Sequence, residues 1–580
     1  MRYLWQSLRR YTKESILAPL FKMLEALFDL TVPMVMADII NSGIAAGDTR
    51  YILTRCALLV LLAVVGTGCS LTAQYFAAQA AVGCAADLRR RLFARVQSLD
   101  AAQVDTLGPS TLLTRLTSDV NQVQNGVNMF LRLFLRSPFI VFGALLLSFT
   151  ISRKAGGIFS IIVLVLFCIV FGMMAFTSPR YQAIQSKLDR VLSVTRENLT
   201  GVRVVRAFDR QNAEVARFDA ANQSLTGAQL TAGRISALLN PMTFLVINLG
   251  VIAVLSTGSV QVNAGTLLSG DVIALINYLS QILVELVKMA NTIVLISKAS
   301  ACMHRVSDVL DTPQGMVFPK EHAILSPATP AVEFDEVSLQ YPGAGGPSLA
   351  GLSFAAQPGQ TIGIIGGTGC GKTSLARLIT RLYDATGGTV RLFGTPIASL
   401  SRSQLRQTVG IVPQEPFLFS GTVRSNLLWG RADADDTDLW SALETAQAAD
   451  FVHSLPDGLD APVEQGGRNF SGGQRQRLTL ARALVGQPPI LILDDCASAL
   501  DFATDAALRR ALQAMPGGRT IFLIAQRTAS IQQADTILVL EDGILAGMGS
   551  HQTLLECCPV YQEIYESQFK GHARREGVQR

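Results

Sequence analysis

The sequence predicts two fold classes in one chain: an α-helical membrane domain with six spans, followed by an α/β phosphate-loop ATPase domain. Only 16% of the 580 residues are charged, and the mean hydropathy is +0.34, which is too apolar for a soluble protein of this size. The long uncharged runs lie in the first half. The second half contains the glycine-rich segment GGTGCGKT directly after a β-rich run, which is typical of a phosphate-binding loop.

Six segments of the first half are apolar and approach or exceed the roughly 20 residues that a helix needs to cross a bilayer. They lie at about residues 16–42, 51–81, 127–151, 155–178, 239–263 and 268–298. The loops that follow the second and fourth spans are rich in arginine, which places them in the cytoplasm. Arg153 and Lys154, between the third and fourth spans, are the exception. We therefore predict a multi-pass protein of the cell membrane (inner or plasma), embedded in the lipid bilayer, with both termini and the second half cytoplasmic.

The two arginine-rich loops have helical periodicity. Apolar residues recur at three and four positions in the first of them, at Leu88, Leu92, Val96 and Leu99. This spacing predicts that the membrane helices continue into the cytoplasm.

Charge and cysteine content exclude two other classes. The formal net charge of +5 is accounted for mainly by the cytoplasmic sides of the spans, so nucleic acid is not an expected partner. The nine cysteines are scattered without paired spacing, which indicates reduced thiols rather than a disulfide framework or a zinc site.

Composition places the domain boundaries. A membrane domain is expected at residues 1–311, a proline-containing linker at 312–330, a nucleotide-binding domain at 331–570 and a polar tail at 571–580. The cytoplasmic domain should open with three strands, AVEFDEVSLQY, GLSFAAQ and TIGIIG, because these runs alternate or are rich in β-branched residues.

GGTGCGKT fits the Walker A pattern, and the helical run SLARLITRLY follows it. Main-chain N–H groups of such a loop face the β- and γ-phosphates, the lysine supplies a charge, and the Ser/Thr hydroxyl suits Mg²⁺. A chance glycine-rich turn is disfavoured by this context. The expected ATP-binding residues are Gly366, Gly367, Thr368, Gly369, Cys370, Gly371, Lys372, Thr373 and Ser374. Cys370 could act as a redox switch, but we favour the simpler interpretation that any small residue fits there.

The run LILDD is the partner of this loop, because it is an apolar buried strand that ends in acids. Asp494 would hold Mg²⁺ through its water shell, together with Thr373. The expected cofactors are ATP and Mg²⁺.

The stretch NFSGGQRQR, residues 469–477, resembles the signature sequence of ATP-binding-cassette (ABC) proteins. Other elements of that family occur in order: Tyr341 as the adenine-stacking aromatic, Gln414 as a metal and catalytic ligand, Glu464, SALD at 498–501 and IAQRTAS at 524–530. The first half resembles the six-helix exporter type in VPMVMADIINSGI (32–44), STLLTRLTSDV (110–120) and LTGVRVVRAFDRQ (199–211). The resemblance thus covers the chain.

The resemblance implies an exporter half-transporter. In this family two halves form a pore, and two cassettes sandwich two ATP molecules head to tail, so that each ATP contacts one chain's Walker motifs and the other chain's signature. The signature residues facing the partner's ATP would be Ser471, Gly472, Gly473 and Gln474. Coupling helices near Asp105–Ser110 and Arg210–Glu214 would transmit cassette closure to the pore.

Two positions depart from the family pattern. Hydrolytic sites carry Glu after the Walker B aspartate and His in the later loop, whereas this chain has Asp495 and Gln526. The shorter side chain retracts the carboxylate by roughly 1.5 Å, and a displacement near 1 Å can cost about 10²-fold in rate. Asp495 and Gln526 are therefore predicted to form a degenerate catalytic site, as in one chain of the heterodimeric multidrug-type exporters. The expected partner is a second ABC half-transporter.

Two functions are compatible with this pattern. One is a subunit of an ATP-driven exporter for amphipathic compounds, namely drugs, lipids or peptides. The alternative is a regulatory ATP-binding membrane subunit that gates a partner without driving transport. An importer cassette is disfavoured, because importer spans usually lie on a separate chain.

Charged residues inside the spans leave the substrate open. Lys22, Glu25 and Asp29 share one face of the first span, and Glu285 and Lys288 share one face of the sixth. They either line a wet cavity or pair with one another.

Overall fold

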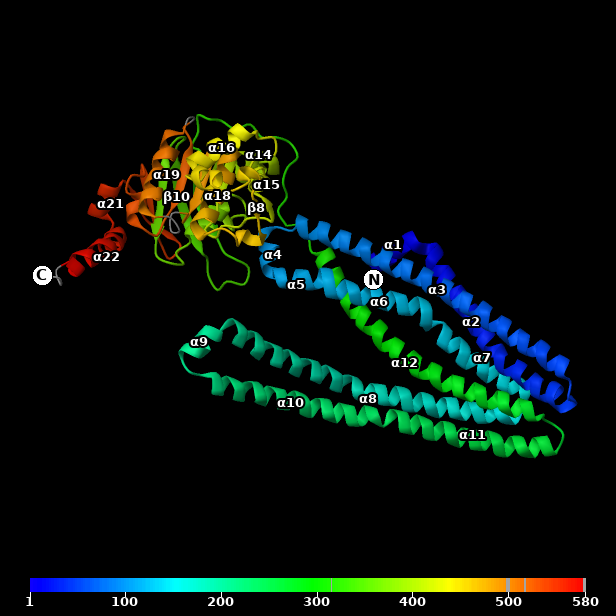
Figure 1. Cartoon of the computed structure of the whole chain (residues 1–580). Coiled ribbons are helices and arrows are strands. Elements are labelled where there is room, and N and C mark those ends of the chain that lie inside the picture. The colour runs from blue at the N-terminus through cyan, green and yellow to red at the C-terminus, as the bar shows by residue number, and fades with distance from the viewer. Residues whose placement is uncertain (314, 497–500, 516–517, 577–580) are drawn as a thin grey trace. The chain divides into compact units, whose positions relative to one another are not determined.

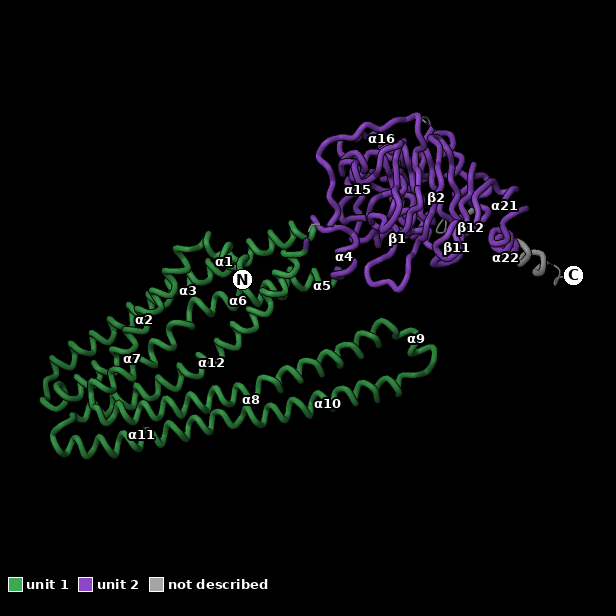
Figure 2. The backbone as a smooth tube through the Cα atoms, turned by 180° about the vertical axis from the view of Figure 1, so that it is seen from behind, with its two compact units in different colours: residues 1–97, 110–312 green, residues 98–109, 313–580 purple. Residues whose placement is uncertain are grey.

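The computed structural model describes residues 1–313, 315–496, 501–515 and 518–576, and the chain divides into two compact units (Figure 1). One unit comprises residues 1–97 and 110–312; the other comprises 98–109 and 313–580 (Figure 2). Residues 98–109, which the sequence places in the membrane domain, therefore pack with the unit that contains the predicted nucleotide-binding domain.

The first unit is helical throughout. Its helices are α1 (Arg2–Leu8), α2 (Thr12–Asp38), α3 (Thr49–Ser98), α5 (Pro109–Thr114), α6 (Val120–Met129), α7 (Arg136–Ile151), α8 (Arg153–Thr200), α9 (Val202–Ala207), α10 (Gln211–Ala237), α11 (Leu239–Asn263) and α12 (Ser269–Asp311). Short π-helical turns follow α2 at Ile39–Ile44, separate α5 from α6 at Arg115–Asp119, and separate α6 from α7 at Phe130–Phe134.

Five helical segments of the described chain are long and apolar enough to cross a membrane. They are Thr49–Ser98, Pro109–Ile151, Arg153–Thr200, Gln211–Asn263 and Ser269–Asp311, and they contain the second to sixth predicted spans. The first predicted span lies in α2, whose 27 residues suffice in length. Its charged residues interrupt the apolar run, so length and composition do not confirm a count of six.

The predicted helical continuation of the spans into the arginine-rich loops is confirmed. α3 has 50 residues and α8 has 48, which at 1.5 Å per residue corresponds to roughly 70–75 Å. This length is more than twice the roughly 30 Å hydrocarbon core of a bilayer. α8 runs beside α10 and α11, and α9 lies at the turn between them (Figure 1).

The core of the first unit joins α2, α7, α8, α11 and α12. Tyr278 of α12 is fully buried, and its hydroxyl donates to the Leu30 carbonyl of α2 at 2.7 Å. This bond satisfies the one polar atom of a large buried side chain.

The second unit contains α4 (Ala101–Leu107) and an α/β fold with three sheets. The strands are β1 (Val332–Leu339), β2 (Leu349–Ala356), β3 (Thr361–Gly366), β4 (Gly387–Leu392), β5 (Thr395–Pro396), β6 (Val409–Val412), β7 (Gly421–Thr422), β8 (Pro462–Val463), β9 (Ile490–Asp494), β10 (Thr520–Ile524), β11 (Thr536–Glu541) and β12 (Ile544–Gly549). Its remaining helices are α13 (Lys372–Ile379), α14 (Arg402–Thr408), α15 (Val423–Leu427), α16 (Asp436–Thr445), α17 (Ala449–His453), α18 (Gly472–Val485), α19 (Phe502–Ala514), α20 (Thr528–Ile531), α21 (His551–Cys557) and α22 (Pro559–Glu576). The three predicted opening strands are confirmed as β1, β2 and β3, whereas the helix after the phosphate loop ends earlier than predicted, at Ile379.

The six-stranded sheet positions the site. Its order is β12-β11-β3-β10-β9-β6, and β11, β3, β10, β9 and β6 are parallel. Ile364 of β3, Ile524 of β10 and Asp494 of β9 lie at one level of the register. The segments that follow β3, β10, β9 and β6 therefore emerge at the same edge, where open α/β sheets bind ligands.

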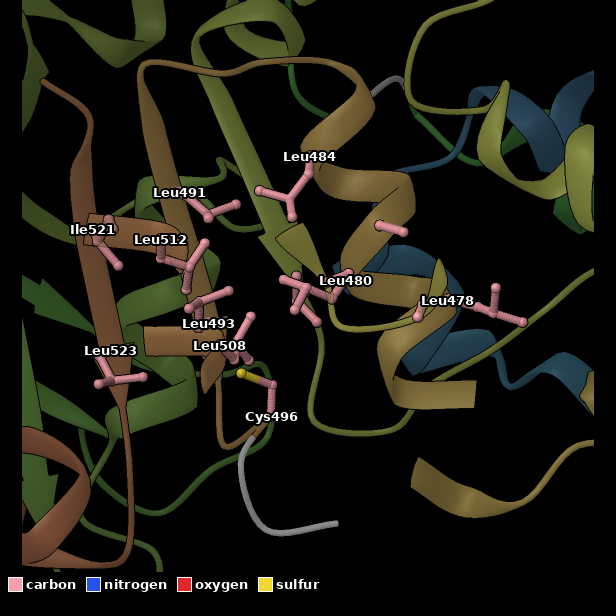
Figure 3. Close-up of a cluster of buried hydrophobic side chains, with 14 of the residues drawn as sticks. Leu478, Leu480, Leu484, Leu491, Leu493, Cys496, Leu508, Leu512, Ile521 and Leu523 are labelled. Atoms are coloured by element: carbon pink, nitrogen blue, oxygen red, sulfur yellow. The ribbon is translucent and has the colours of Figure 1, made fainter. Parts of the chain in front are cut away.

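A hydrophobic cluster anchors α18 to this sheet. Leu480 and Leu484 of α18 join Leu491 and Leu493 of β9 in one buried group, to which α19 and β10 also contribute (Figure 3). The body of α18 is thus tied to β9, the strand that ends at Asp494.

The chain end packs on the same domain. Tyr561 of α22 is fully buried in this cluster, and its hydroxyl bonds His551 Nδ1 at 2.7 Å. α22 continues to Glu576, so residues 571–576 of the predicted polar tail are helical; residues 577–580 lie outside the described chain.

Candidate nucleotide-binding site

The phosphate loop lies between the end of β3 and the start of α13. Gly371 has φ +100°, and a Cβ there would lie 2.8 Å from the Ser348 carbonyl oxygen. A Cβ at Gly366 would overlap the Leu540 carbonyl. Only glycine fits both positions, so the loop's backbone lies as close to its neighbours as the predicted motif requires.

The loop is closed around the Lys372 ammonium. Lys372 Nζ donates to the carbonyls of Gly366 at 2.9 Å and Gly367 at 2.7 Å, and it lies 3.6 Å from Cys370 Sγ. A positive charge therefore sits beside the N-terminus of α13, where free N–H groups favour phosphate. Cys370 is buried, in keeping with a small packing residue.

Thr373 and Asp494 are brought together. Burial raises the pKa of the Asp494 carboxyl above its ordinary value, and the nearby Thr373 hydroxyl partly offsets this effect. A buried carboxylate and a hydroxyl are hard oxygen donors of the kind Mg²⁺ takes, and a cation would offset the cost of burying the charge. The donor set fits Mg²⁺, which when bound would neutralise charge on the phosphates. Gln414 lies exposed two residues after β6, and its side chain makes no hydrogen bond within the described residues.

The two residues that depart from the family pattern touch each other. Gln526 Nε2 donates to Asp495 Oδ2 at 2.8 Å. Asp495 is 8% exposed, and burial raises the pKa of its carboxyl. Its backbone has φ +48°, a left-handed conformation that Asp adopts more readily than most residues. The carboxylate is thus occupied by a neutral amide, which can donate a hydrogen bond but cannot accept a proton at neutral pH.

Tyr341 lies at a small cavity of about 240 Å³. Its hydroxyl is 3.0 Å from Ser374 Oγ on α13, and its ring meets Tyr383 edge to face at 4.9 Å. The Tyr383 hydroxyl in turn donates to Asp105 of α4. The cavity is lined by Ala102, Asp105, Thr106, Tyr341, Pro342, Arg377 and Tyr383.

Tyr341→Ala is expected to weaken ATP binding to this chain by roughly 3- to 10-fold, because an aromatic stacking partner of about 0.5–1.5 kcal/mol is removed. Titration of the full-length protein in lipid with a fluorescent ATP analogue measures this. Tyr341→Phe is the control: it keeps the ring and loses only the hydroxyl contacts, with Ser374 Oγ and with Arg377 Nη1. Unchanged affinity in the alanine variant would place the adenine elsewhere.

The signature residues open α18 and face outward. Ser471 is the N-cap: its Oγ accepts from Gln474 N at 3.3 Å, and its N–H donates to Gln474 Oε1 at 2.9 Å. Ser471 and Gly472 are exposed, and a Cβ at Gly472 would meet nothing within 4 Å. The helix start is therefore capped from within its own motif and leaves a small, open N-terminal surface beside Gly473.

The SALD element, predicted at 498–501, lies outside the described residues except for Asp501. Asp501 caps α19, since its Oδ1 accepts from Thr504 N at 2.9 Å. Thr368 and Gly369 lie in the phosphate loop, and Gly369 has φ +86°.

The charged residues of the membrane domain pair with one another. Lys22 Nζ lies 2.5 Å from Glu25 Oε2, and Lys288 Nζ lies 3.0 Å from Glu285 Oε1. Between these two sets lies Arg136, whose guanidinium bonds Asp29 at 2.7 Å and Glu285 at 2.6 Å. Of the two interpretations left open by the sequence, pairing is what the structure contains.

Arg136 is the member of this cluster that sequence reasoning missed. It stands in the third span, and its side chain is only 10% exposed. The indication was present, because a buried cation in a span that brings no acid of its own must find anions on other helices.

All nine cysteines are free. Cys69, Cys84, Cys302, Cys370, Cys496 and Cys558 are buried, as expected for reduced thiols that pack in helices and strands.

Residues 15–286 match the family model of the ABC transporter transmembrane region, and residues 349–498 match the family model named ABC transporter. The chain belongs to the ABC transporter family. It is 35% identical to an uncharacterized ABC transporter ATP-binding protein of Mycobacterium tuberculosis (strain CDC 1551 / Oshkosh), covering 97% of each chain. It is 30% identical to the ATP-dependent lipid A-core flippase of Chromobacterium violaceum (strain ATCC 12472), covering 96% of this chain and 95% of that one.

The fold agrees with this assignment. The structure of a bacterial Atm1-family ABC exporter with ATP bound superposes with a TM-score of 0.79 at 25% identity, covering 97% of this chain and 98% of the other. The protein is an ABC exporter in which a helical transmembrane region precedes an ABC ATPase domain that couples ATP hydrolysis to transport.

Proposed function

We propose that this ABC exporter is one subunit of a heterodimer that moves amphipathic compounds out of the cytoplasm. It binds ATP at a degenerate site of its own and supplies Ser471–Gln474 to the competent site of its partner. The observation that carries the proposal is the contact between Asp495 and Gln526, because both departures from the hydrolytic pattern lie in one hydrogen-bonded pair beside an intact Walker loop.

The signature motif at the start of α18 supports the second part of the proposal, that this chain completes the ATP site of its partner. An N-capped, exposed helix start with open space around Gly472 can approach a phosphate bound by a second chain. A chain with an intact signature and a weak catalytic pair forms a hydrolytic site only with a partner that carries the catalytic Glu and His. Such a partner can itself have a weakened signature.

The substrate class is proposed from the family. A relative is named as a flippase for the lipid A core, which fits the lipid part of the class of drugs, lipids and peptides. We also assign α2 as the first of six spans, because its charged residues Lys22, Glu25 and Asp29 are held in ion pairs. Insertion in the cell membrane with the cassette and both termini cytoplasmic, and the domain limits 1–311, 312–330, 331–570 and 571–580, belong to the same proposal.

Alone in lipid, this chain is expected to hydrolyse ATP at least about 10-fold more slowly per cassette than the purified pair, because a homodimer would combine two degenerate sites. Phosphate release from matched amounts of the lone chain and the pair measures this. Equal turnover per cassette would refute the heterodimer. A pair that hydrolyses ATP but moves no substrate in vesicles would instead favour the alternative, a regulatory subunit that gates its partner.

A further inference from the structure

The C-terminal helix reaches the ATP site through one side chain, Gln568 of α22. Its Nε2 donates to the Gln526 carbonyl at 2.8 Å. Its Oε1 accepts from the Thr528 N–H at 2.8 Å and from the Thr528 hydroxyl at 2.9 Å. One amide about 40 residues further along the chain thus makes three hydrogen bonds to the three-residue segment 526–528.

The segment needs this partner. α20 starts at Thr528, and its N-cap, Arg527, makes no side-chain capping bond; an arginine side chain has no acceptor to offer. The first N–H groups of a helix have no intrahelical acceptor, and Thr528 is fully buried, away from water. Gln568 therefore acts as the cap of α20 from a different helix.

The same amide also sets the position of Gln526. Its donor holds the Gln526 main chain, while the Gln526 side chain holds Asp495 Oδ2 at 2.8 Å. The contacts form a continuous series from α22 to the second acidic residue of the site. α22 itself is anchored by Tyr561, so Gln568 is presented from a packed helix.

We infer that Gln568 is a positioning residue for this chain's ATP site: it fixes the loop that carries Gln526 and thereby controls how long the site retains ATP. The inference rests on the proposed function, in which this site holds nucleotide. A site that hydrolyses slowly contributes to the exporter by staying occupied, so a residue that fixes its γ-phosphate side acts on the dwell time of the bound nucleotide.

Two substitutions separate positioning from simple stability. Gln568→Leu removes all three bonds. Gln568→Glu keeps acceptors for Thr528, and its charge suits a helix N-terminus, but it cannot donate to the Gln526 carbonyl when ionised. The glutamate variant should therefore preserve the fold of α20 while releasing Gln526.

The matched control is Gln562→Leu. Gln562 lies on the same helix and donates to the Leu555 carbonyl at 2.5 Å, not to the 526–528 segment. This variant tests whether the loss of any glutamine hydrogen bond on α22 is enough to accelerate nucleotide release.

The experiment measures release of a fluorescent ATP analogue with Mg²⁺ from the full-length chain in lipid, together with thermal stability. Release from the Gln568→Glu and Gln568→Leu variants is expected to be roughly 5- to 10-fold faster, as for the loss of about one hydrogen bond. Release from Gln562→Leu is expected to match the unsubstituted protein, and Gln568→Glu should retain its thermal stability.

A double substitution tests the route. If Gln568 acts through Gln526, adding Gln568→Leu to Gln526→Ala will accelerate release no further. The inference would be overturned if the two substitutions accelerated release by the product of their single effects. It would also be overturned if the Gln568→Glu variant released nucleotide as slowly as the unsubstituted chain. An analogue that still binds after Lys372→Ala would instead show that the Walker loop is not its site, which contradicts the proposed function.

Discussion

In the purified complex with its partner, Ser471→Ala is expected to reduce ATP turnover by roughly 10²- to 10³-fold, the range seen when one preorganised donor to a reacting group is lost. The serine would contact the γ-phosphate held by the partner's Walker motifs. Asp495→Asn is expected to leave most of the turnover, because the proposed degenerate site would contribute little chemistry. Phosphate release at saturating ATP measures both.

Lys372→Ala is the control for occupancy. Its ammonium is at the centre of this chain's phosphate loop, so its loss should weaken nucleotide binding here and reduce turnover to an intermediate level. Gly472→Asp should match Ser471→Ala, because a carboxylate in the open space at Gly472 would repel phosphate. If Asp495→Asn stops turnover while Ser471→Ala is tolerated, the assignment of the working site is reversed.

Local sequence predicted most of the nucleotide site. Gly366, Gly371 and Lys372 are contiguous in the chain, and each has a conformational or charge requirement that few residue types meet, so the motif determines the loop. The acidic pair after β9 was predicted for the same reason, since an apolar strand that ends in acids has one reasonable place in a parallel sheet.

Contacts between distant segments could not be predicted. The amide of Gln526 was known to differ from an imidazole, but its bond to Asp495 depends on β9 and β10 being adjacent strands. Gln568 lies in a polar helical run, and nothing in its neighbours distinguishes it from Gln562. Hydrogen bonds of this kind depend on how distant segments pack together, and they produce no periodicity or spacing that could be recognised in a single sequence.

The charged cluster of the membrane domain also depends on contacts between distant segments. It consists of Lys22, Glu25, Asp29, Arg136, Glu285 and Lys288. Helical spacing correctly placed Lys22, Glu25 and Asp29 on one face of the first span, but two interpretations stayed open because their partners lie elsewhere. Arg136 favours pairing, and its role depends on α7 packing against both α2 and α12.

Arg136→Met is expected to destabilise the membrane domain by about 3–5 kcal/mol, the usual cost of leaving buried charges without their partner. Arg136 contacts Asp29 and Glu285 at once, and Glu285 is 4% exposed. Methionine keeps most of the apolar stem, so the loss comes mainly from the charge. Unfolding of the full-length protein in mild detergent, followed by the protease resistance of the membrane domain, measures the change.

Arg132→Met is the matched control, because Arg132 precedes Arg136 by about one turn on the same segment and makes no ion pair in the described chain. It should change stability by less than about 1 kcal/mol. The double substitution Arg136→Met with Glu285→Met should recover part of the loss, since replacing both partners of a buried pair by apolar groups is often close to neutral. Equal effects of Arg132→Met and Arg136→Met would mean that the cluster is solvated in the membrane, which would restore the wet cavity as the better description of Lys22, Glu25, Asp29, Glu285 and Lys288.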